Sequence, residues 1–299
     1  MGVFTIVDVA LRIMRRHLGA ALVLSLVVIG PGALLTAATG VRFNEEALDL
    51  LSLADTGSAS SPPVLTASQV EGLVRAAAAF ILASAFAGVL GALAALGFSA
   101  IVRSDYLAGR TGAQAALRTS LARALPALGV VLLTSLLIVA IIAGGVALMV
   151  VAMATLSAGS FEAGGPGVFL ALVAGVATVL AVVYLTLRWA VALPLIALEG
   201  AGVRSALARS WQLTADGVWR TFAVVGLAGL IAAILAALLS NVLALVLVDV
   251  LAPELGLDVV VTEAVVAALA SVVLAPLAPV AAAVLYHDLR VRRENCSPG

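Results

Sequence analysis

The sequence predicts an all-α integral membrane protein with six transmembrane helices, arranged as three repeated hairpins. Composition, six long apolar stretches and the placement of arginine predict this fold class. Hydrophobic residues make up 64% of the 299 residues, charged residues make up 11%, and the mean hydropathy is +1.23. Soluble domains are about 45–50% apolar and about 25% charged. The composition therefore excludes a soluble domain, and it also excludes a disordered chain, which would be polar.

Six stretches have the roughly 20 apolar residues that a helix needs to cross about 30 Å of hydrocarbon. They lie at 18–39, 73–102, 124–155, 168–187, 221–248 and 264–285. The first stretch is longer than the apolar core of a signal peptide, so we expect it to remain as a span. Pro276 and Pro279 predict a kink in the sixth.

The arginines are divided unequally between the two sides of the predicted membrane. One side holds Arg12, Arg15, Arg16, Arg103, Arg110, Arg118, Arg123, Arg188, Arg204, Arg209, Arg220, Arg290, Arg292 and Arg293. The other side holds Arg42, Arg75 and ten of the 16 acidic residues. Cytoplasmic loops carry the excess of basic residues, so both termini are expected in the cytoplasm. We expect one membrane domain, 1–289, followed by a polar cytoplasmic tail, 290–299.

A degenerate repeat precedes the first, third and fifth spans. The sequences ALR at 10–12, ALR at 116–118 and ALAR at 206–209 each belong to a short segment with one apolar face. Such segments are typical of amphipathic helices that lie in the plane of the interface. The predicted repeating unit is therefore a short interfacial helix followed by an out-and-back hairpin.

The first outer loop, at about 40–72, is the longest. Ser68 and Glu71 have the spacing of a capping box, which predicts that the second helix begins near Gln69. Glu71 and Arg75 have the i,i+4 spacing of an ion pair. Asn241 is polar within the fifth span, and we expect it to bond a neighbouring helix.

Arg188 is the ionisable residue nearest to the interior of a span. It ends the fourth span, but apolar sequence continues beyond it. Glu199 lies about 16 Å further along a continuous helix, so the two could pair only if Pro194 breaks that helix. Asp105 and Asp288 are then the candidate partners and the candidate structural ion-pair residues. Two interpretations stay open: a structural or snorkelling arginine, and an arginine that binds an anionic headgroup or ligand.

Groups that carry catalytic or metal chemistry are sparse. The cores of the six spans contain no ionisable residue, which argues against a proton pump or a coupled transporter. His17, His287 and Cys296 have no metal-ligand spacing, and no nucleophile, phosphate-binding or zinc-hydrolase motif occurs in a suitable context. We therefore expect no catalytic, cofactor-binding or metal-binding residues and no cofactor. The formal net charge is zero, which argues against nucleic acid as a partner.

Three stretches resemble a known bacterial membrane domain. They are RW at 188–189 with Pro194 and EG at 199–200, ALARSWQL at 206–213 with WR at 219–220, and LYHDLRVRRE at 285–294. The domain is the one attached to some glycerophosphoryl diester phosphodiesterases, which also has stand-alone relatives. In the fused members, catalysis belongs to a separate soluble barrel with metal-binding carboxylates and histidines. This chain has two histidines and ends at Gly299, so the resemblance implies a membrane domain without the catalytic barrel, and we expect no enzyme.

The expected function is non-enzymatic, namely lipid organisation or partner binding at the cytoplasmic face of the bacterial plasma membrane. All three tryptophans and all three tyrosines fall near that face, where they serve either as simple anchors or as part of a site for headgroups or a partner. The candidate contact residues are Arg188, Trp189, Glu199, Arg204, Arg209, Trp211, Trp219 and Arg220. Membrane lipids, anionic ones included, and a membrane or cytoplasmic protein are the expected partners. The alternative is a facilitator or transporter subunit for a small or lipid-like solute, and lipid enzymology ranks last.

Overall fold

Six helices are long and apolar enough to cross a membrane in the computed structural model, which describes residues 2–56, 66–107, 109, 112–157, 164–248, 254, 256 and 258–296. The candidate spans are Leu18–Asp49, Glu71–Tyr106, Ala124–Met149, Phe169–Glu199, Val218–Val246 and Val261–Arg292. The described residues contain no strand. The all-α fold class with six spans is therefore confirmed.

The helices fall into three units along the chain. In order they are α1 (Val3–Arg16), α2 (Leu18–Leu24), a π-helical turn (Ser25–Ile29), α3 (Gly30–Thr56), α4 (Ala67–Tyr106), α5 (Ala113–Ala122), α6 (Ala124–Ser157), α7 (Gly164–Arg188), α8 (Ala192–Glu199), α9 (Val203–Thr214), a 3-10 turn (Ala215–Gly217), α10 (Val218–Val246), α12 (Val259–Leu274) and α13 (Leu277–Cys296). The short helices α1, α5 and α9 precede the hairpins, as the repeat predicts.

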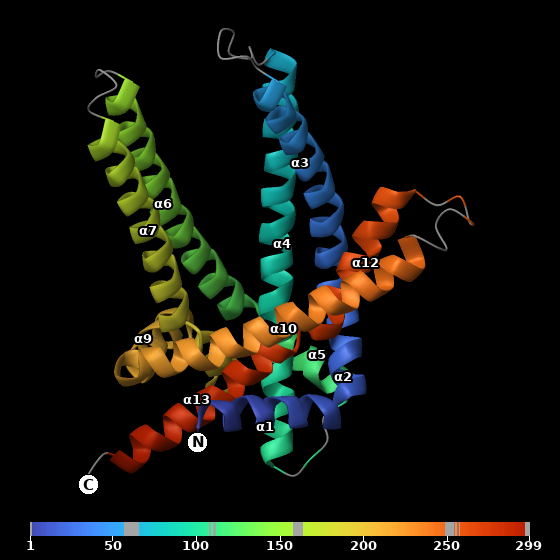
Figure 1. Ribbon diagram of the computed structural model, residues 1–299. Coiled ribbons are helices and arrows are strands. Elements are labelled where there is room, and N and C mark those ends of the chain that lie inside the picture. The colour runs from blue at the N-terminus through green and yellow to red at the C-terminus, as the bar shows by residue number, and fades with distance from the viewer. Residues whose placement is uncertain are drawn as a thin grey trace.

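The three hairpins diverge from a common base (Figure 1). In this view α3 with α4 and α6 with α7 rise from the base, whereas α10 and α12 extend to one side. Helix α12 also packs against α3, and α6 packs mainly against α7. Both chain ends lie at the base, beside α1 and α13. An even number of spans requires the two ends to lie on the same side.

Equivalent alanines attach the three short helices to the base. Ala10 in α1, Ala116 in α5 and Ala206 in α9 are each fully buried, and they occupy matching positions in the sequence repeat. A small side chain at this position lets each short helix pack closely against the long helices. The sequence repeat is therefore also a structural one.

The apolar core lies at the base. Its largest fully buried side chains include Phe98 of α4, Ile196 of α8 and Tyr286 of α13. By contrast, only 11% of the most apolar window of the third span is buried, against 50% for the sixth. The α6–α7 hairpin therefore exposes most of its apolar surface, as expected of helices that face lipid.

The outer ends of the first hairpin differ from the prediction. Helix α3 continues to Thr56, so the first half of the expected loop is helical, and residues 57–65 of that loop lie outside the described residues. The capping box that begins α4 uses Thr66 and Gln69 rather than Ser68 and Glu71, so the helix begins at Ala67. The predicted Glu71–Arg75 ion pair forms at 2.6 Å.

Prolines interrupt three spans. Pro31 has no N–H for the Val27 carbonyl, and the chain forms a π-helical turn at this point in the first span. The fourth span breaks at 189–191, just before Pro194, and the sixth breaks between α12 and α13 at the predicted Pro276. Helix α13 then runs through 290–296, so no helix end marks the predicted boundary after residue 289.

Asn241 corrects a further expectation. Its Nδ2 donates to the carbonyl of Ala237, one turn earlier in α10, at 2.7 Å, and the residue is exposed. It therefore satisfies its polar group within its own helix rather than on a neighbouring one, because a short side chain easily reaches the i−4 carbonyl.

Candidate functional site: the arginine-rich face

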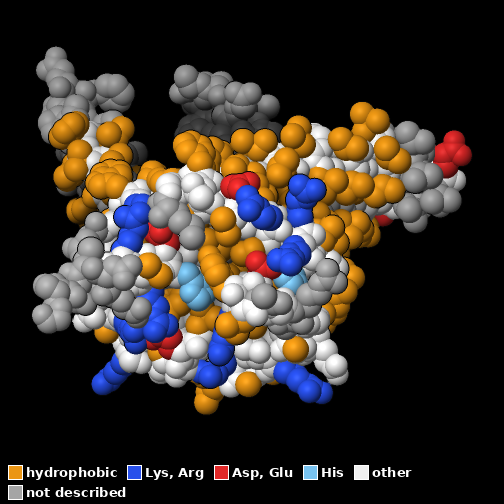
Figure 2. Space-filling model, turned by 90° about the horizontal axis from the view of Figure 1, so that it is seen from below, with side chains coloured by type: hydrophobic (Ala, Val, Ile, Leu, Met, Phe, Trp, Pro, Cys, Tyr) orange, Lys and Arg blue, Asp and Glu red, His pale blue; other side chains and the backbone are white. Residues whose placement is uncertain are grey.

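The base of the molecule carries most of the charge. Figure 2 views this end and shows arginine side chains spread over it, with apolar side chains on the hairpins at its edge. We call this end the arginine-rich face. Its described arginines are Arg12, Arg15, Arg16, Arg103, Arg118, Arg123, Arg188, Arg204, Arg209, Arg220, Arg290 and Arg292.

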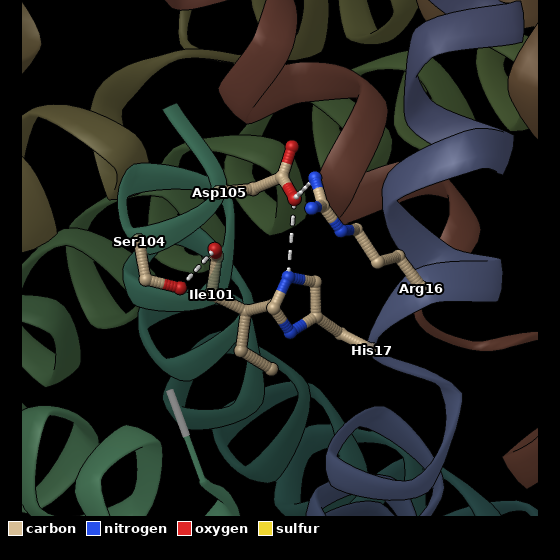
Figure 3. Close-up of polar contacts among 5 residues, drawn as sticks. All are labelled: Arg16, His17, Ile101, Ser104 and Asp105. Carbon is tan, nitrogen blue, oxygen red and sulfur yellow. Dashed lines mark hydrogen bonds and ion pairs between the residues drawn. The ribbon is translucent and has the colours of Figure 1, made fainter. Parts of the chain in front are cut away.

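Asp105 joins the two ends of the first hairpin (Figure 3). Its Oδ1 accepts a hydrogen bond from Arg16 Nη1 at 3.2 Å and lies 3.2 Å from His17 Nε2. Helix α1 ends at Arg16, and the turn at His17 directs both side chains toward the last turn of α4. The His17 side chain is almost completely buried. The start of the outgoing leg is therefore fixed to the end of the returning leg.

Asp288 does the same in the third hairpin. Its Oδ2 accepts hydrogen bonds from Arg220 at 2.7 Å and from Arg292 at 3.0 Å. The Asp288 side chain is only 5% exposed, which makes it the most buried of the carboxylates whose ion pairs the structure describes on this face. Arg220 lies in the first turn of α10 and Asp288 lies on α13, which places the contact at the entry and exit of the hairpin.

In the second hairpin a helix end replaces the carboxylate. Arg123 precedes α6, and its Nη1 donates to the carbonyl of Ile196 in the last turn of α8 at 3.2 Å. Cations are favourable at this negative end of a helix. Gly200 follows with φ of +73°, and any Cβ there would overlap Arg123 Nη1. Glycine therefore serves both the backbone turn and the passage of the guanidinium.

The three contacts have similar places in the three units. In each unit a basic side chain between the last residue of the short helix and the first turn of the outgoing helix bonds a polar group at the exit of the hairpin. We call these contacts the entry–exit clasps: Arg16 and His17 with Asp105, Arg123 with the Ile196 carbonyl, and Arg220 with Asp288. The candidate ion-pair residues Asp105 and Asp288 both occupy clasps.

Glu199 connects the second and third units. Arg209 of α9 lies 2.6 Å from its carboxylate, Arg290 of α13 lies 3.7 Å away, and the Tyr286 hydroxyl donates to it. The helix break after Arg188 lets α8 change direction, which brings Glu199 to these partners. Glu199 and Arg209 therefore form an ion pair in which the Arg209 side chain stays half-exposed.

The carboxylates of the face whose side chains the structure describes, Asp8, Asp105, Glu199 and Asp288, are all in ion pairs. They bind Arg12, Arg16, Arg209, Arg220, Arg290 and Arg292. Among the described side chains, the other six arginines have no carboxylate within ion-pair distance: Arg15, Arg103, Arg118, Arg123, Arg188 and Arg204. The face therefore keeps a surplus of positive charge after pairing.

Arg188 lies against aromatic rings. Its guanidinium carbon is 4.7 Å from the centroid of the Trp211 ring and 5.0 Å from that of Tyr184. Nε and Nη2 donate to the Tyr184 hydroxyl at 2.9 and 2.6 Å, and Nη1 lies 3.4 Å from the Trp211 carbonyl oxygen. These contacts replace the expected pairing with Asp105 or Asp288, because both carboxylates bind other bases in the clasps. Cation–π contacts stabilise a guanidinium without neutralising its charge.

The remaining candidate residues face outward to different degrees. Trp219 is 84% exposed, with its ring edge-on to Phe222, and Arg204 is exposed on α9. Trp189 is half-buried beside Trp211, at 6.4 Å between ring centroids. The predicted set therefore divides into clasp and linking residues, an arginine held by aromatic rings, and exposed residues at the edge of the face.

Residues outside the predicted set carry part of this architecture. His17, Arg123, Tyr184 and Tyr286 each contact a candidate residue or complete a clasp. The signal that could have identified His17 and Arg123 is the repeat itself, since both follow a short helix directly. The i,i+4 spacing of Tyr184 and Arg188 on α7 could have indicated their contact. No spacing rule indicates the contact between Tyr286 and Glu199, which are 87 residues apart.

The fold and this face define a multi-pass helical membrane protein with one strongly basic end. Residues 166–297 match the family model described as the membrane domain of glycerophosphoryl diester phosphodiesterase. The match confirms the resemblance over α7 to α13, a stretch that contains Arg188, Glu199 and the Asp288 clasp. No curated protein and no solved structure shows a significant match to the chain.

Proposed function

We propose that the protein is a non-enzymatic component of the cytoplasmic membrane, with its arginine-rich face in the cytoplasm, where it binds anionic lipid headgroups. The observation that carries the proposal is the surplus of arginine: the face has twelve described arginines, and only six of them lie in ion pairs with its four described carboxylates. Each basic residue near an anionic leaflet contributes about 1 kcal/mol of attraction.

The aromatic residues support the same proposal. Trp219 and Trp211 expose ring surface at this end of the spans, and such rings favour the headgroup layer. Arg188 makes three hydrogen bonds, and a guanidinium has five N–H groups, so two remain for a phosphate oxygen. The clasps, in turn, hold the short helices and hairpin ends rigidly enough to present this charge.

The test compares the lipids that the protein retains in nanodiscs of phosphatidylcholine and phosphatidylglycerol. The variant replaces Arg15, Arg118 and Arg204 by glutamine, because these exposed residues lie outside the clasps. The matched control is Arg42→Gln, an exposed arginine on α3, away from the arginine-rich face. Wild-type protein and the control should enrich phosphatidylglycerol, and the triple variant should lose on the order of fivefold per arginine at low salt and less at high salt.

Equal retention of the two lipids by wild-type protein at low salt would overturn the proposal. The same cations could instead hold an acidic cytoplasmic protein. In that case co-purification of such a protein, and not lipid enrichment, would disappear in the triple variant.

An apolar cavity supports the alternative function, a facilitator for a lipid-like solute. It measures about 370 Å³ and lies between α6 and α7, beside Gly145, Met149, Gly175 and Thr178. A cavity of this size and lining fits part of an acyl chain. The alternative predicts that purified protein accelerates the movement of a labelled lipid between the leaflets of a vesicle, which the headgroup-binding function does not require.

The absence of catalysis is also part of the proposal. Purified protein should not hydrolyse glycerophosphodiesters. Hydrolysis of this kind needs a nucleophile or metal with a base in reach, and the sequence contains no motif that would supply this set. Turnover that co-elutes with the protein and disappears in His17→Ala or His287→Ala would contradict this.

A further inference from the structure

A cavity of about 300 Å³ opens on the arginine-rich face between α4, α5 and α8. Its charged lining residue is Arg103, its hydroxyl groups are Ser104 and Thr119, and its apolar wall includes Ala100, Ala115 and Ala197. The cavity lies at the junction of the first two repeat units and is separate from the Arg188 contacts. A volume near 300 Å³ is at the small end for ligand pockets, so it fits one headgroup rather than a whole lipid.

The charge of Arg103 is not compensated within the described part of the chain. No described carboxylate lies within ion-pair distance of its guanidinium, and the residue is exposed on the last turns of α4. Asp105 is two residues away, but its Oδ1 is occupied by Arg16 and His17 on the α1 side of the helix. The cavity therefore has a positive potential.

Three helix ends at the cavity affect this potential. Gly112, the N-cap of α5, provides no side-chain cap and the Ala115 N–H bonds the Gly112 carbonyl, so this positive helix end contributes through its dipole. The negative end of α8 near Ala197 would repel an anion, but Arg123 donates to the Ile196 carbonyl there. At the negative end of α4, the N–H groups of Leu107 and Gly109 bond the Arg103 and Ser104 carbonyls.

The hydroxyl groups complete a set of donors. Ser104 Oγ donates to the Ile101 carbonyl at 2.7 Å (Figure 3), and Thr119 Oγ1 donates to the Ala115 carbonyl at 3.0 Å. Hydroxyl hydrogens rotate, so each group can turn from its helix carbonyl to an oxygen in the cavity. Guanidinium and hydroxyl donors around an apolar wall are suited to a phosphate oxygen, since charge-assisted hydrogen bonds are the strong ones.

We propose that this cavity binds the phosphate of one anionic headgroup, with Arg103 as its charged ligand and Ser104 and Thr119 as hydroxyl donors. This inference rests on the proposed function and narrows it from a basic surface to one stoichiometric site. The phosphate could belong to a lipid or be free, and the experiment distinguishes the two sources.

The experiment measures how many phosphatidylglycerol molecules stay bound to protein released from mixed phosphatidylcholine nanodiscs, by native mass spectrometry. Two variants remove the site in different ways: Arg103→Gln removes the charge, and Ala115→Leu fills the cavity but keeps the charge. Arg12→Gln is the matched control, since it removes an exposed arginine of the same face that pairs with Asp8 and is not among the arginines proposed to bind headgroups. Circular dichroism and elution volume establish that each variant is folded.

Wild-type protein and Arg12→Gln should retain one phosphatidylglycerol. Both cavity variants should retain it at least about tenfold more weakly, as the loss of a charged hydrogen bond predicts. Competition by inorganic phosphate, but not by chloride at equal ionic strength, would identify a site that also takes free phosphate. If neither phosphate nor chloride displaces the bound phosphatidylglycerol, the site is specific for the lipid.

The outcomes separate this inference from the proposed function. General enrichment of phosphatidylglycerol with no stoichiometric lipid, or with equal losses in Arg103→Gln and Arg12→Gln, would overturn the cavity site alone. Retention by Ala115→Leu would place the phosphate outside the cavity and overturn the inference as well. Absence of any enrichment in wild-type protein would overturn both proposals.

Discussion

Arg220 donates a hydrogen bond to Asp288 at 2.7 Å, although 68 residues separate them in the chain. The contact joins the first turn of α10 to α13, and it is the third of the entry–exit clasps. Because the Asp288 side chain is 5% exposed, removal of its charge would leave the guanidinium of Arg220 at a largely buried position without this carboxylate. The clasps should therefore contribute to stability in proportion to their burial.

Asp288→Asn should lower the free energy of unfolding by about 1.5–3 kcal/mol, because it removes a charge-assisted hydrogen bond from the largely buried guanidinium of Arg220. Asp8→Asn is the control, since Asp8 forms an ion pair with Arg12 in which both side chains are exposed. That substitution should change stability by less than about 1 kcal/mol. The midpoint of denaturant-induced unfolding in detergent measures both, and equal effects would contradict the role of the clasp.

Gly200→Ala should destabilise the second clasp. The backbone there has φ of +73°, where an L-residue costs about 1–2 kcal/mol, and the new methyl group would overlap Arg123 Nη1. Gly226→Ala is the matched control, because a Cβ at that position in α10 meets open space. The control should be neutral or stabilising by up to about 1 kcal/mol. Thermal unfolding of the two variants side by side tests the difference in sign.

Gly145→Ala should loosen the α6–α7 hairpin, whereas Gly144→Ala should not. A Cβ on Gly145 would overlap the Thr178 side chain of α7, but one on Gly144 meets nothing within 4 Å. Overpacking of this kind costs about 1–3 kcal/mol. The double variant Gly145→Ala, Thr178→Ala should recover part of the loss in unfolding midpoint. If the Thr178→Ala substitution does not restore stability, the loss in Gly145→Ala does not come from overlap with the Thr178 side chain.

The orientation of the chain can be tested by labelling in intact cells. In a Cys296→Ser background, Asn44→Cys should react with a membrane-impermeant thiol reagent added from outside, and Gln114→Cys should react only after lysis. Both positions are exposed, one on α3 and the other on α5 of the arginine-rich face. The unequal distribution of arginine predicts this result. The opposite labelling pattern would invert the topology.

Most of the helical architecture could be predicted because it depends on local chemistry. The apolar runs, the short amphipathic helices and the kink near Pro276 follow from composition and periodicity alone, and the structure confirms them. The start of α4 was misassigned because two overlapping motifs, Thr66 with Gln69 and Ser68 with Glu71, both satisfy the capping pattern. Only the packing of the loop decides between them.

The contacts of the candidate site were less predictable because they join distant segments. Arg188 and Glu199 lie close in sequence, yet Arg188 contacts Tyr184 of its own helix and Trp211 of α9. Glu199, which follows the helix break, pairs with Arg209. A one-dimensional pattern identifies which residues are charged. It does not specify which of several arginines each carboxylate will bind, since that depends on the direction that α8 takes after the break.

The entry–exit clasps also determine where the protein can adapt to a bilayer. The two legs of each hairpin are joined at the arginine-rich face, so their spacing there cannot change without breaking an entry–exit clasp. Away from this face the three hairpins diverge from one another (Figure 1). A thicker or thinner hydrocarbon layer should therefore be accommodated by tilting at the far ends, at a small cost per ångström, while the depth of the basic face stays constant.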